Sequence, residues 1–358
     1  MDKLTKKKAL LNSIRSSEGV NFECDENAIH EEYKAQGENK SSLAIKILSI
    51  FGGFIATLAF LGFLAIAGLY NSELGLLIFG IGFITSAIWL NKAYNKIIID
   101  TFSISIYVIG FALFAFGLLE MNVDKNIITI LISFIALSSL IVTQNFILSF
   151  ISVLIISGNF IFLIISNNSY DLIHLYVFIN TLCLTYLFLN EAKLISSSKR
   201  ISQLYNPVRI GLIISLLFGL VSIGKRHLIP ISQGYIWLSS IAMILVIMYL
   251  VYSIIKINEI KTIKSKVLIY TLSTLILIPT IFSPSISGAI LIILLSFLVN
   301  YKTGLAIGII SIIYFVSQYY YDLNFTLLTK SIILFISGVI FLLFYLFTIK
   351  NLNKNEKI

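Results

Sequence analysis

The sequence predicts an all-α, polytopic integral membrane protein, a helix bundle with about twelve transmembrane helices. Apolar stretches of about 18 to 25 residues, separated by short polar loops, fill almost all of the chain after residue 42. A helix rises about 1.5 Å per residue and a bilayer core is about 30 Å thick, so about 20 apolar residues cross it. Charged residues make up 12% of the chain and hydrophobic residues 58%, whereas a typical soluble domain is about 25% charged.

The chain divides into three regions by composition. Residues 1–42 are polar, residues 43–349 form the transmembrane helical domain, and residues 350–358 form a short polar tail. Apolar and basic residues alternate with helical spacing in residues 1–15, and an acidic stretch follows them. Such a basic amphipathic helix can lie on an anionic leaflet or pack, solvated, on the cytoplasmic loops.

The apolar stretches define the expected helices of the membrane domain. In chain order they cover residues 46–70, 74–91, 97–119, 126–143, 145–165, 171–190, 207–224, 234–255, 266–282, 284–300, 303–319 and 326–349. The tightest joins, 143–145 and 283–285, are either true loops or parts of a bent helix or a re-entrant hairpin. The second interpretation would change the number of spans.

Basic residues in the loops predict the orientation of the helices. With a cytoplasmic N-terminus, the cytoplasmic loops would carry Lys92, Lys96, Lys193, Lys199, Arg200, Arg209, Lys256, Lys261, Lys264, Lys266 and Lys302. The opposite loops would carry Lys125, Lys225 and Arg226. Because short cytoplasmic loops are enriched in Lys and Arg, we expect both termini in the cytoplasm and an even number of spans.

The net charge of +9 raises the question of a nucleic-acid partner. Nucleic-acid binding requires a clustered basic face, whereas the positive excess here is spread over small membrane loops. We therefore expect the lipid bilayer, and no nucleic acid, as a partner. Cys24 and Cys183 form no metal-binding spacing, so we expect no metal and no cofactor.

The densest group of polar residues comes at the join between the last two predicted spans. It contains Gln318, Tyr319, Tyr320, Tyr321 and Asp322, followed by Lys330 five residues into an apolar run. In one interpretation the tyrosines belong to an interfacial aromatic belt and the lysine extends to the headgroups. In the other, the tyrosines wall a ligand-binding pocket on the outer face, and Lys330 attracts an anionic headgroup.

A basic group follows the seventh predicted span. Lys225, Arg226 and His227 would lie outside the cytoplasm, against the general distribution of positive charge. They contact lipid phosphates or, if the seventh and twelfth spans are neighbours, line the same outer pocket. We identify no catalytic residue.

Two ionisable residues near predicted helix starts have two interpretations each, because an ionisable group in lipid is costly. Asp100 begins a polar stripe in the third span and is either a cation or proton site or a carboxylate stabilised by the helix dipole. His174 is either a hydrogen-bonded packing residue or a proton carrier. Asn145 and Asn159 are expected to bridge helices, and the Gly304/Gly308 pair allows close helix approach.

Three stretches of the chain resemble the bacterial membrane family called domain of unknown function 4401. They are Asp100–Gly110, Tyr205–Gly211 and the C-terminal run that includes Gly288–Leu291, Tyr319–Leu323, Thr326–Ser331 and Gly338. The resemblance covers about residues 43–349 and implies a multi-pass protein of the bacterial inner membrane. It also implies an association with a second polytopic protein of unknown function. Phe111 stands where the family pattern has Gln, so the resemblance does not support an essential polar site in the third span.

Three functional classes are compatible with the sequence. The first is a non-enzymatic component that acts with another membrane protein, since the short loops leave little room for a soluble catalytic domain. The second is a secondary transporter, because the loop 191–209 divides the predicted spans into two equal groups, as in transporters with parallel repeats. The third is an intramembrane enzyme on a lipid-linked substrate, with Asp322 and His227 as the acid–base candidates.

Overall fold

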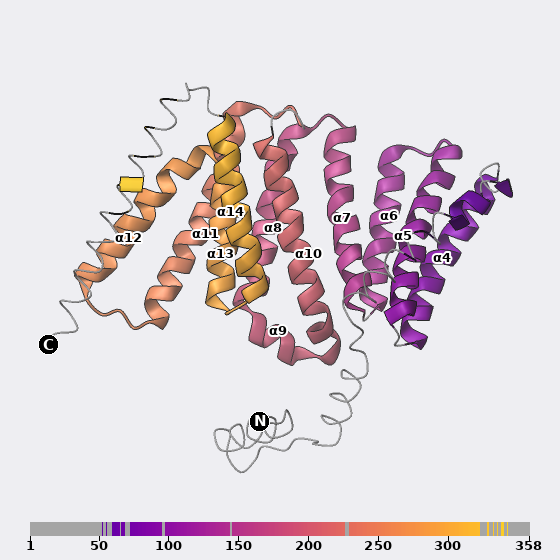
Figure 1. Ribbon diagram of the computed structural model, residues 1–358, viewed down its shortest axis with the longest axis horizontal. Coiled ribbons are helices and arrows are strands. Elements are labelled where there is room, and N and C mark those ends of the chain that lie inside the picture. Colours follow the sequence, from indigo (N-terminus) through magenta and orange to yellow (C-terminus); the bar gives the residue numbers. More distant parts are fainter. Residues whose placement is uncertain are drawn as a thin grey trace, which may run out of the picture. The chain divides into compact units, whose positions relative to one another are not determined.

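The computed structural model describes residues 59–64, 66–68, 72–94, 97–143, 145–225 and 229–322, together with isolated positions beyond them. These residues are helical or lie in turns, which confirms the predicted all-α class for them (Figure 1). The polar region 1–42 and the tail 350–358 lie outside them, as do most of the predicted spans 46–70 and 326–349.

The chain forms two compact units, residues 1–72 with 81–110 and residues 73–80 with 111–358. The helices are α4 (Glu73–Ala93), α5 (Ile97–Glu120), α6 (Lys125–Val142), α7 (Phe146–Ser166), η2 (Tyr170–Leu172), α8 (Ile173–Leu189), α9 (Glu191–Ser197), α10 (Lys199–Gly224), η3 (Gln233–Tyr235), α11 (Ile236–Ile257), α12 (Ile263–Leu277), η4 (Ile278–Phe282), α13 (Pro284–Leu298) and α14 (Lys302–Asp322). The sites below lie in the second unit.

Every predicted span from 74–91 to 303–319 has a helix at its place. Within the described part of the chain, nine helical segments are long and apolar enough to cross a membrane. The helix α13 has only 15 residues and falls below that length. Large apolar side chains such as Phe134 and Leu245 are 67% and 66% exposed, which is the pattern expected of a surface that faces hydrocarbon.

At both tight joins one helix ends and another begins: α6 ends at Val142 before α7 starts at Phe146, and η4 ends at Phe282 before α13 starts at Pro284. Asn145 caps α7, because its Oδ1 accepts hydrogen bonds from the Ile147 and Leu148 amides at 2.8 and 3.2 Å. Pro284 begins α13 directly after η4, at a position where a helix needs no N–H donor.

Several helices end in the same compact turn, which explains how the loops can be so short. A residue with positive φ follows the helix, and the next amide donates back to a carbonyl five residues earlier. The pairs are Asn122 with Val123, Asn168 with Ser169, Glu259 with Ile260, and Asn300 with Tyr301. The last of these turns reverses the chain between α13 and α14.

The helix α10 lies at the centre of the second unit and packs against α7, α8, α9, α13 and α14. It begins at Lys199 rather than at residue 207, because the Ser198 hydroxyl caps it by accepting from the Ile201 amide at 3.2 Å. The predicted loop 191–209 is therefore wrong: the short helix α9 and the first turns of α10 occupy it.

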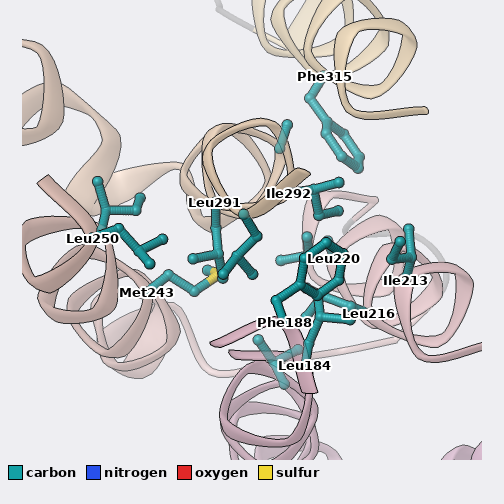
Figure 2. Close-up of a cluster of buried hydrophobic side chains, with 14 of the residues drawn as sticks. Leu184, Phe188, Ile213, Leu216, Leu220, Met243, Leu250, Leu291, Ile292 and Phe315 are labelled. Atoms are coloured by element: carbon teal, nitrogen blue, oxygen red, sulfur yellow. The ribbon is translucent and has the colours of Figure 1, made fainter. Parts of the chain in front are cut away.

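Residues 190–198 connect α8 to α10, and we call them the connector. One apolar core contains side chains from helices on both sides of it. Figure 2 shows Leu184 and Phe188 of α8, Leu216 and Leu220 of α10, Met243 of α11 and Leu291 of α13 packed together. Each of these side chains is at most 1% exposed. The helices α7 and α8 before the connector and α10 to α14 after it thus contribute to one core. A smaller cluster of Phe114, Leu118 and Ile128 lies between α5 and α6.

Two predicted helix contacts are confirmed. The Asn159 amide of α7 donates to the Ser133 hydroxyl of α6 at 2.9 Å. A Cβ atom at Gly308 of α14 would lie 2.7 Å from a carbon of Ile293 in α13, so glycine is needed for that approach.

The bundle has two ends that matter for the sites below. At the first, which we call the Lys225 end, α10 and α14 finish while α8, α11 and α13 begin. At the second, the Glu191 end, α8 runs into α9 and the α13–α14 turn lies beside α10.

Candidate functional site

The residues predicted to form an outer pocket are partly placed by the structure. Tyr319, Tyr320 and Tyr321 lie in the last turns of α14, and Lys225 is the exposed residue that ends α10. Arg226, His227 and Lys330 lie outside the described residues, and so do the side chains of Asp322 and Asp100. Asp100 itself belongs to the first turn of α5.

A cavity of about 240 Å³ lies at the Lys225 end of the bundle. It is lined by Ile223, Gly224, Ile236, Phe282, Ser283, Pro284, Ser285, Phe315, Gln318 and Tyr319. Of the predicted pocket residues, Tyr319 lines it, whereas the Tyr321 side chain is 76% exposed. We call this cavity the Gln318 pocket.

Local structure explains why the pocket forms where α10 and α14 end and α13 begins. The helix α10 stops at Gly224, and the Lys225 amide donates to the Val221 carbonyl at 2.9 Å. A Cβ atom at Gly224 would lie 3.1 Å from the Ser285 hydroxyl and 3.3 Å from the Gln318 amide nitrogen. Glycine therefore leaves room at this point for the starts and ends of the neighbouring helices.

Gln318 gives the pocket its unused hydrogen-bonding capacity. Its Oε1 atom is buried and has no hydrogen-bond partner among the residues that the structure describes. The neighbouring Ser285 hydroxyl is already engaged, since it donates to the Leu220 carbonyl at 2.9 Å. A buried acceptor without a donor costs about 1–3 kcal/mol, so a donor supplied by water or by a ligand would be stabilised here.

The chemistry available in the Gln318 pocket is hydrogen bonding. Its lining offers an amide, two serine hydroxyls and a tyrosine, set among apolar side chains. No carboxylate, histidine or cationic side chain is among its described lining residues. Its volume is below the roughly 300–1,000 Å³ of sites for drug-sized ligands, so it fits a small polar group or one part of a larger molecule.

At the Glu191 end, the structure shows a cluster that sequence reasoning missed. Arg209, assigned to a cytoplasmic loop by the sequence, lies well inside α10 and is only 5% exposed. Its Nη1 donates to Glu191 Oε1 at 3.0 Å, and its Nη2 donates to Asn206 Oδ1 at 2.6 Å. The loop assignment is wrong because α10 begins before the apolar stretch does.

Aromatic rings enclose the same guanidinium group. Its central carbon lies 3.6 Å from the ring centre of Tyr301, 4.8 Å from that of Tyr205 and 5.5 Å from that of Phe188. Cation–π attraction of this kind is strongest where the charge is removed from water. We call Arg209, Glu191, Asn206 and the three rings the Arg209 clamp; it ties together α8, α9, α10 and the α13–α14 turn.

A signal for the clamp was present in the sequence. Tyr205 and Asn206 stand four and three residues before Arg209, the spacings that bring side chains together on a helix. They belong to the Tyr205–Gly211 stretch on which the family resemblance rests. The contributions of Glu191, Phe188 and Tyr301 come from other segments and could be found only from the fold.

His174 shows its predicted hydrogen-bonded form. It is 6% exposed, and its Nδ1 lies 2.8 Å from the Ser239 hydroxyl of α11. Its Nε2 is buried and lacks a partner within the described part of the chain.

These features define an all-helical protein with membrane-length apolar helices and a main apolar core in its second unit. The family model of the domain of unknown function 4401 matches residues 42–350, so the chain belongs to this family. The resemblance noted in the sequence is thereby confirmed. No curated protein and no solved structure matches the chain.

Proposed function

We propose that this protein is a multi-pass protein of the bacterial cytoplasmic membrane, with both termini in the cytoplasm. In this proposal it is a non-enzymatic component that acts with another membrane protein. The Lys225 end then faces outward and the Glu191 end faces the cytoplasm. The described lysines support this orientation: Lys256, Lys261 and Lys266 surround one hollow between α11 and α12, as expected beside an anionic inner leaflet.

The observation that carries the proposal is the apolar core to which helices on both sides of the connector contribute. Leu184 of α8 and Leu216 of α10 come from opposite sides of that connector and pack in the same buried cluster. The Arg209 clamp fastens the connector residue Glu191 to α10 and to the α13–α14 turn. Helices that are held together in this way favour a rigid protein that acts through its surfaces.

The transporter alternative receives less support from this geometry. Alternating access requires one repeat to rock against the other around a site near the midplane. Here α10 packs against α7 and α8 as well as against α13 and α14. The region between α8, α10, α11 and α13 is filled with buried apolar side chains.

The enzyme alternative depends on residues that lie outside the described part of the chain. General acid–base catalysis needs a carboxylate, a histidine or a comparable group within reach of the substrate. Among its described residues, the Gln318 pocket offers only neutral hydrogen-bonding groups and Tyr319. This chemistry fits recognition of a polar group better than catalysis.

Crosslinking in native membranes followed by purification in a mild detergent tests the proposal. We expect a second multi-pass membrane protein to be recovered in constant proportion with the tagged chain. Arg209→Gln should lower this recovery, because it loosens the clamp. Arg200→Gln removes the same charge from an exposed position on the same helix and should leave it unchanged. Recovery of the crosslinked chain as a lone monomer would refute the proposal.

A further inference from the structure

A groove runs along the outside of the bundle between α8 and α11, with a volume of about 560 Å³. Its apolar wall consists of Leu175, Phe178, Leu238, Ile241, Ala242 and Leu245. The lining residues follow helical spacing on both helices, so each helix contributes one continuous face. The lining residues extend from Asp171 to Phe178 and, within α11, from Leu238 to Leu245. Seven residue steps in each segment correspond to a groove about 10 Å long.

The apolar wall is open to the surroundings of the bundle. Leu175 and Leu245 are 53% and 66% exposed, respectively. In the proposed membrane this side of α8 and α11 faces hydrocarbon. An occupant therefore enters laterally, and an acyl chain matches the wall in shape and polarity.

The surface of the groove is almost entirely apolar, and the polar residues that line it lie at one end. Asp171, His174 and Tyr235 line it at the Lys225 end, where both helices begin. Asp171 is exposed, and its carboxylate is oriented by Ser232, whose amide donates to Oδ1 at 2.9 Å and whose hydroxyl donates to Oδ2 at 2.8 Å. Each carboxylate oxygen accepts one of these hydrogen bonds and has the capacity to accept another.

His174 supplies a second polar atom at this end. His174 Nδ1 and the Ser239 hydroxyl share a hydrogen bond. We assign the tautomer in which the hydroxyl donates to Nδ1, so that the proton of the neutral imidazole lies on Nε2. Nε2 is buried, as is 94% of the residue, and it has no hydrogen-bond partner among the described residues. A ligand with an acceptor oxygen at this depth would satisfy it.

From these observations we infer that the groove between α8 and α11 binds a phospholipid whose headgroup carries a primary amine. The acyl chain lies along the leucine, isoleucine and phenylalanine wall. The ammonium group pairs with Asp171, and a phosphate or ester oxygen accepts from His174 Nε2. A carboxylate at the mouth disfavours an anionic headgroup, while a quaternary amine lacks the N–H donors that the carboxylate can accept.

The inference rests on the membrane placement in the proposed function, but not on the existence of a protein partner. Native mass spectrometry of the purified full chain in detergent tests it directly. The probes are phosphatidylethanolamine, phosphatidylcholine and phosphatidylglycerol with identical acyl chains. We expect phosphatidylethanolamine to bind about threefold to fivefold more tightly than phosphatidylcholine, as one exposed ion pair with hydrogen bonds permits. Equal binding of the three lipids would overturn the inference.

Two variants with matched controls locate the site. Asp171→Asn should reduce phosphatidylethanolamine binding to the level of phosphatidylcholine. Asp124→Asn, at an exposed helix cap where Asn serves equally well, should leave the preference intact. Ala242→Phe should remove the bound lipid whatever its headgroup, whereas Ala306→Phe, at an exposed position of α14, should not. Equal lipid binding by a variant and its control would contradict the placement in this groove.

Discussion

The guanidinium carbon of Arg209 lies 3.6 Å from the ring centre of Tyr301, so a buried charge on α10 is covered by the turn between α13 and α14. The position of the ring follows from the turn. Asn300 adopts a φ of 53°, and the Tyr301 amide donates to the Ser296 carbonyl at 2.8 Å. A local turn signal thereby determines a contact between helices that are distant in sequence.

We expect Tyr301→Leu to lower the free energy of unfolding by about 1–2 kcal/mol, because the cation loses its closest ring. Thermal unfolding of the purified protein in detergent measures the change. Tyr249→Leu, at a 54% exposed position of α11, serves as the control and should shift stability by less than about 0.5 kcal/mol. An equal loss in both variants would show that the ring–cation contact contributes nothing specific.

The ion pair inside the clamp permits a double-mutant cycle. Glu191→Leu leaves the 5% exposed Arg209 without its carboxylate and should cost about 1–3 kcal/mol. Arg209→Met added to that change should cost much less than it does alone, with a coupling energy of about 1–2 kcal/mol. Lys225→Met, at the far end of α10, should add to Glu191→Leu without coupling. Additivity in the first cycle would contradict the pairing.

Substitutions of Gln318 and Ser285 test separately whether the Gln318 pocket contributes to partner recognition and to stability. Gln318→Leu removes an acceptor that has no described partner, so we expect the unfolding free energy to change by less than about 1 kcal/mol. Ser285→Ala removes the bond to the Leu220 carbonyl and should cost about 1 kcal/mol. Partner recovery after crosslinking should fall in Gln318→Leu at unchanged protein level. Recovery of the partner at the wild-type level in this variant would show that the Gln318 pocket does not contribute to partner recognition.

The length of the apolar stretches predicted most of the fold, because each membrane helix requires a run of apolar residues that can be recognised in the sequence alone. It misplaced the start of α10, since the residues before Pro207 are polar and yet helical, with Ser198 as the cap. Arg209 was assigned to a loop because it is positively charged and follows these polar residues closely. The structure shows a buried cation whose main partners come from three other segments.

The predicted outer pocket stays a prediction, because Arg226, His227 and Lys330 lie outside the described residues. Tyr319 was expected there and lines the Gln318 pocket. The other described walls come from the ends of α10 and η4 and the starts of α11 and α13. Which helix ends meet depends on packing that the loop sequences do not encode. Gln318 belonged to the polar group predicted at this join but was given no role there, because a neutral amide near a helix end carries no distinctive sequence signal.

The orientation can be tested by cysteine labelling. In a background with Cys24→Ser and Cys183→Ser, we expect Lys225→Cys to react with a membrane-impermeant maleimide in intact cells. Lys302→Cys should react only after permeabilisation, because the distribution of lysines places the Glu191 end in the cytoplasm. Both positions are exposed in the structure. The opposite labelling pattern would invert the proposed topology.

A disulfide between α7 and α10 distinguishes a rigid component from a transporter. The hydroxyl oxygens of Ser157 and Ser215 are 2.7 Å apart, and they belong to helices on opposite sides of the connector. In the same cysteine-free background, the pair Ser157→Cys and Ser215→Cys should therefore crosslink when a mild oxidant is added. A rigid component should complement a deletion strain equally well with the bond formed or reduced, because these helices do not need to separate. Ser157→Cys alone controls for the substitution. Loss of complementation that appears only on oxidation, and is reversed by a reductant, would show that the helices move against each other and would favour alternating access.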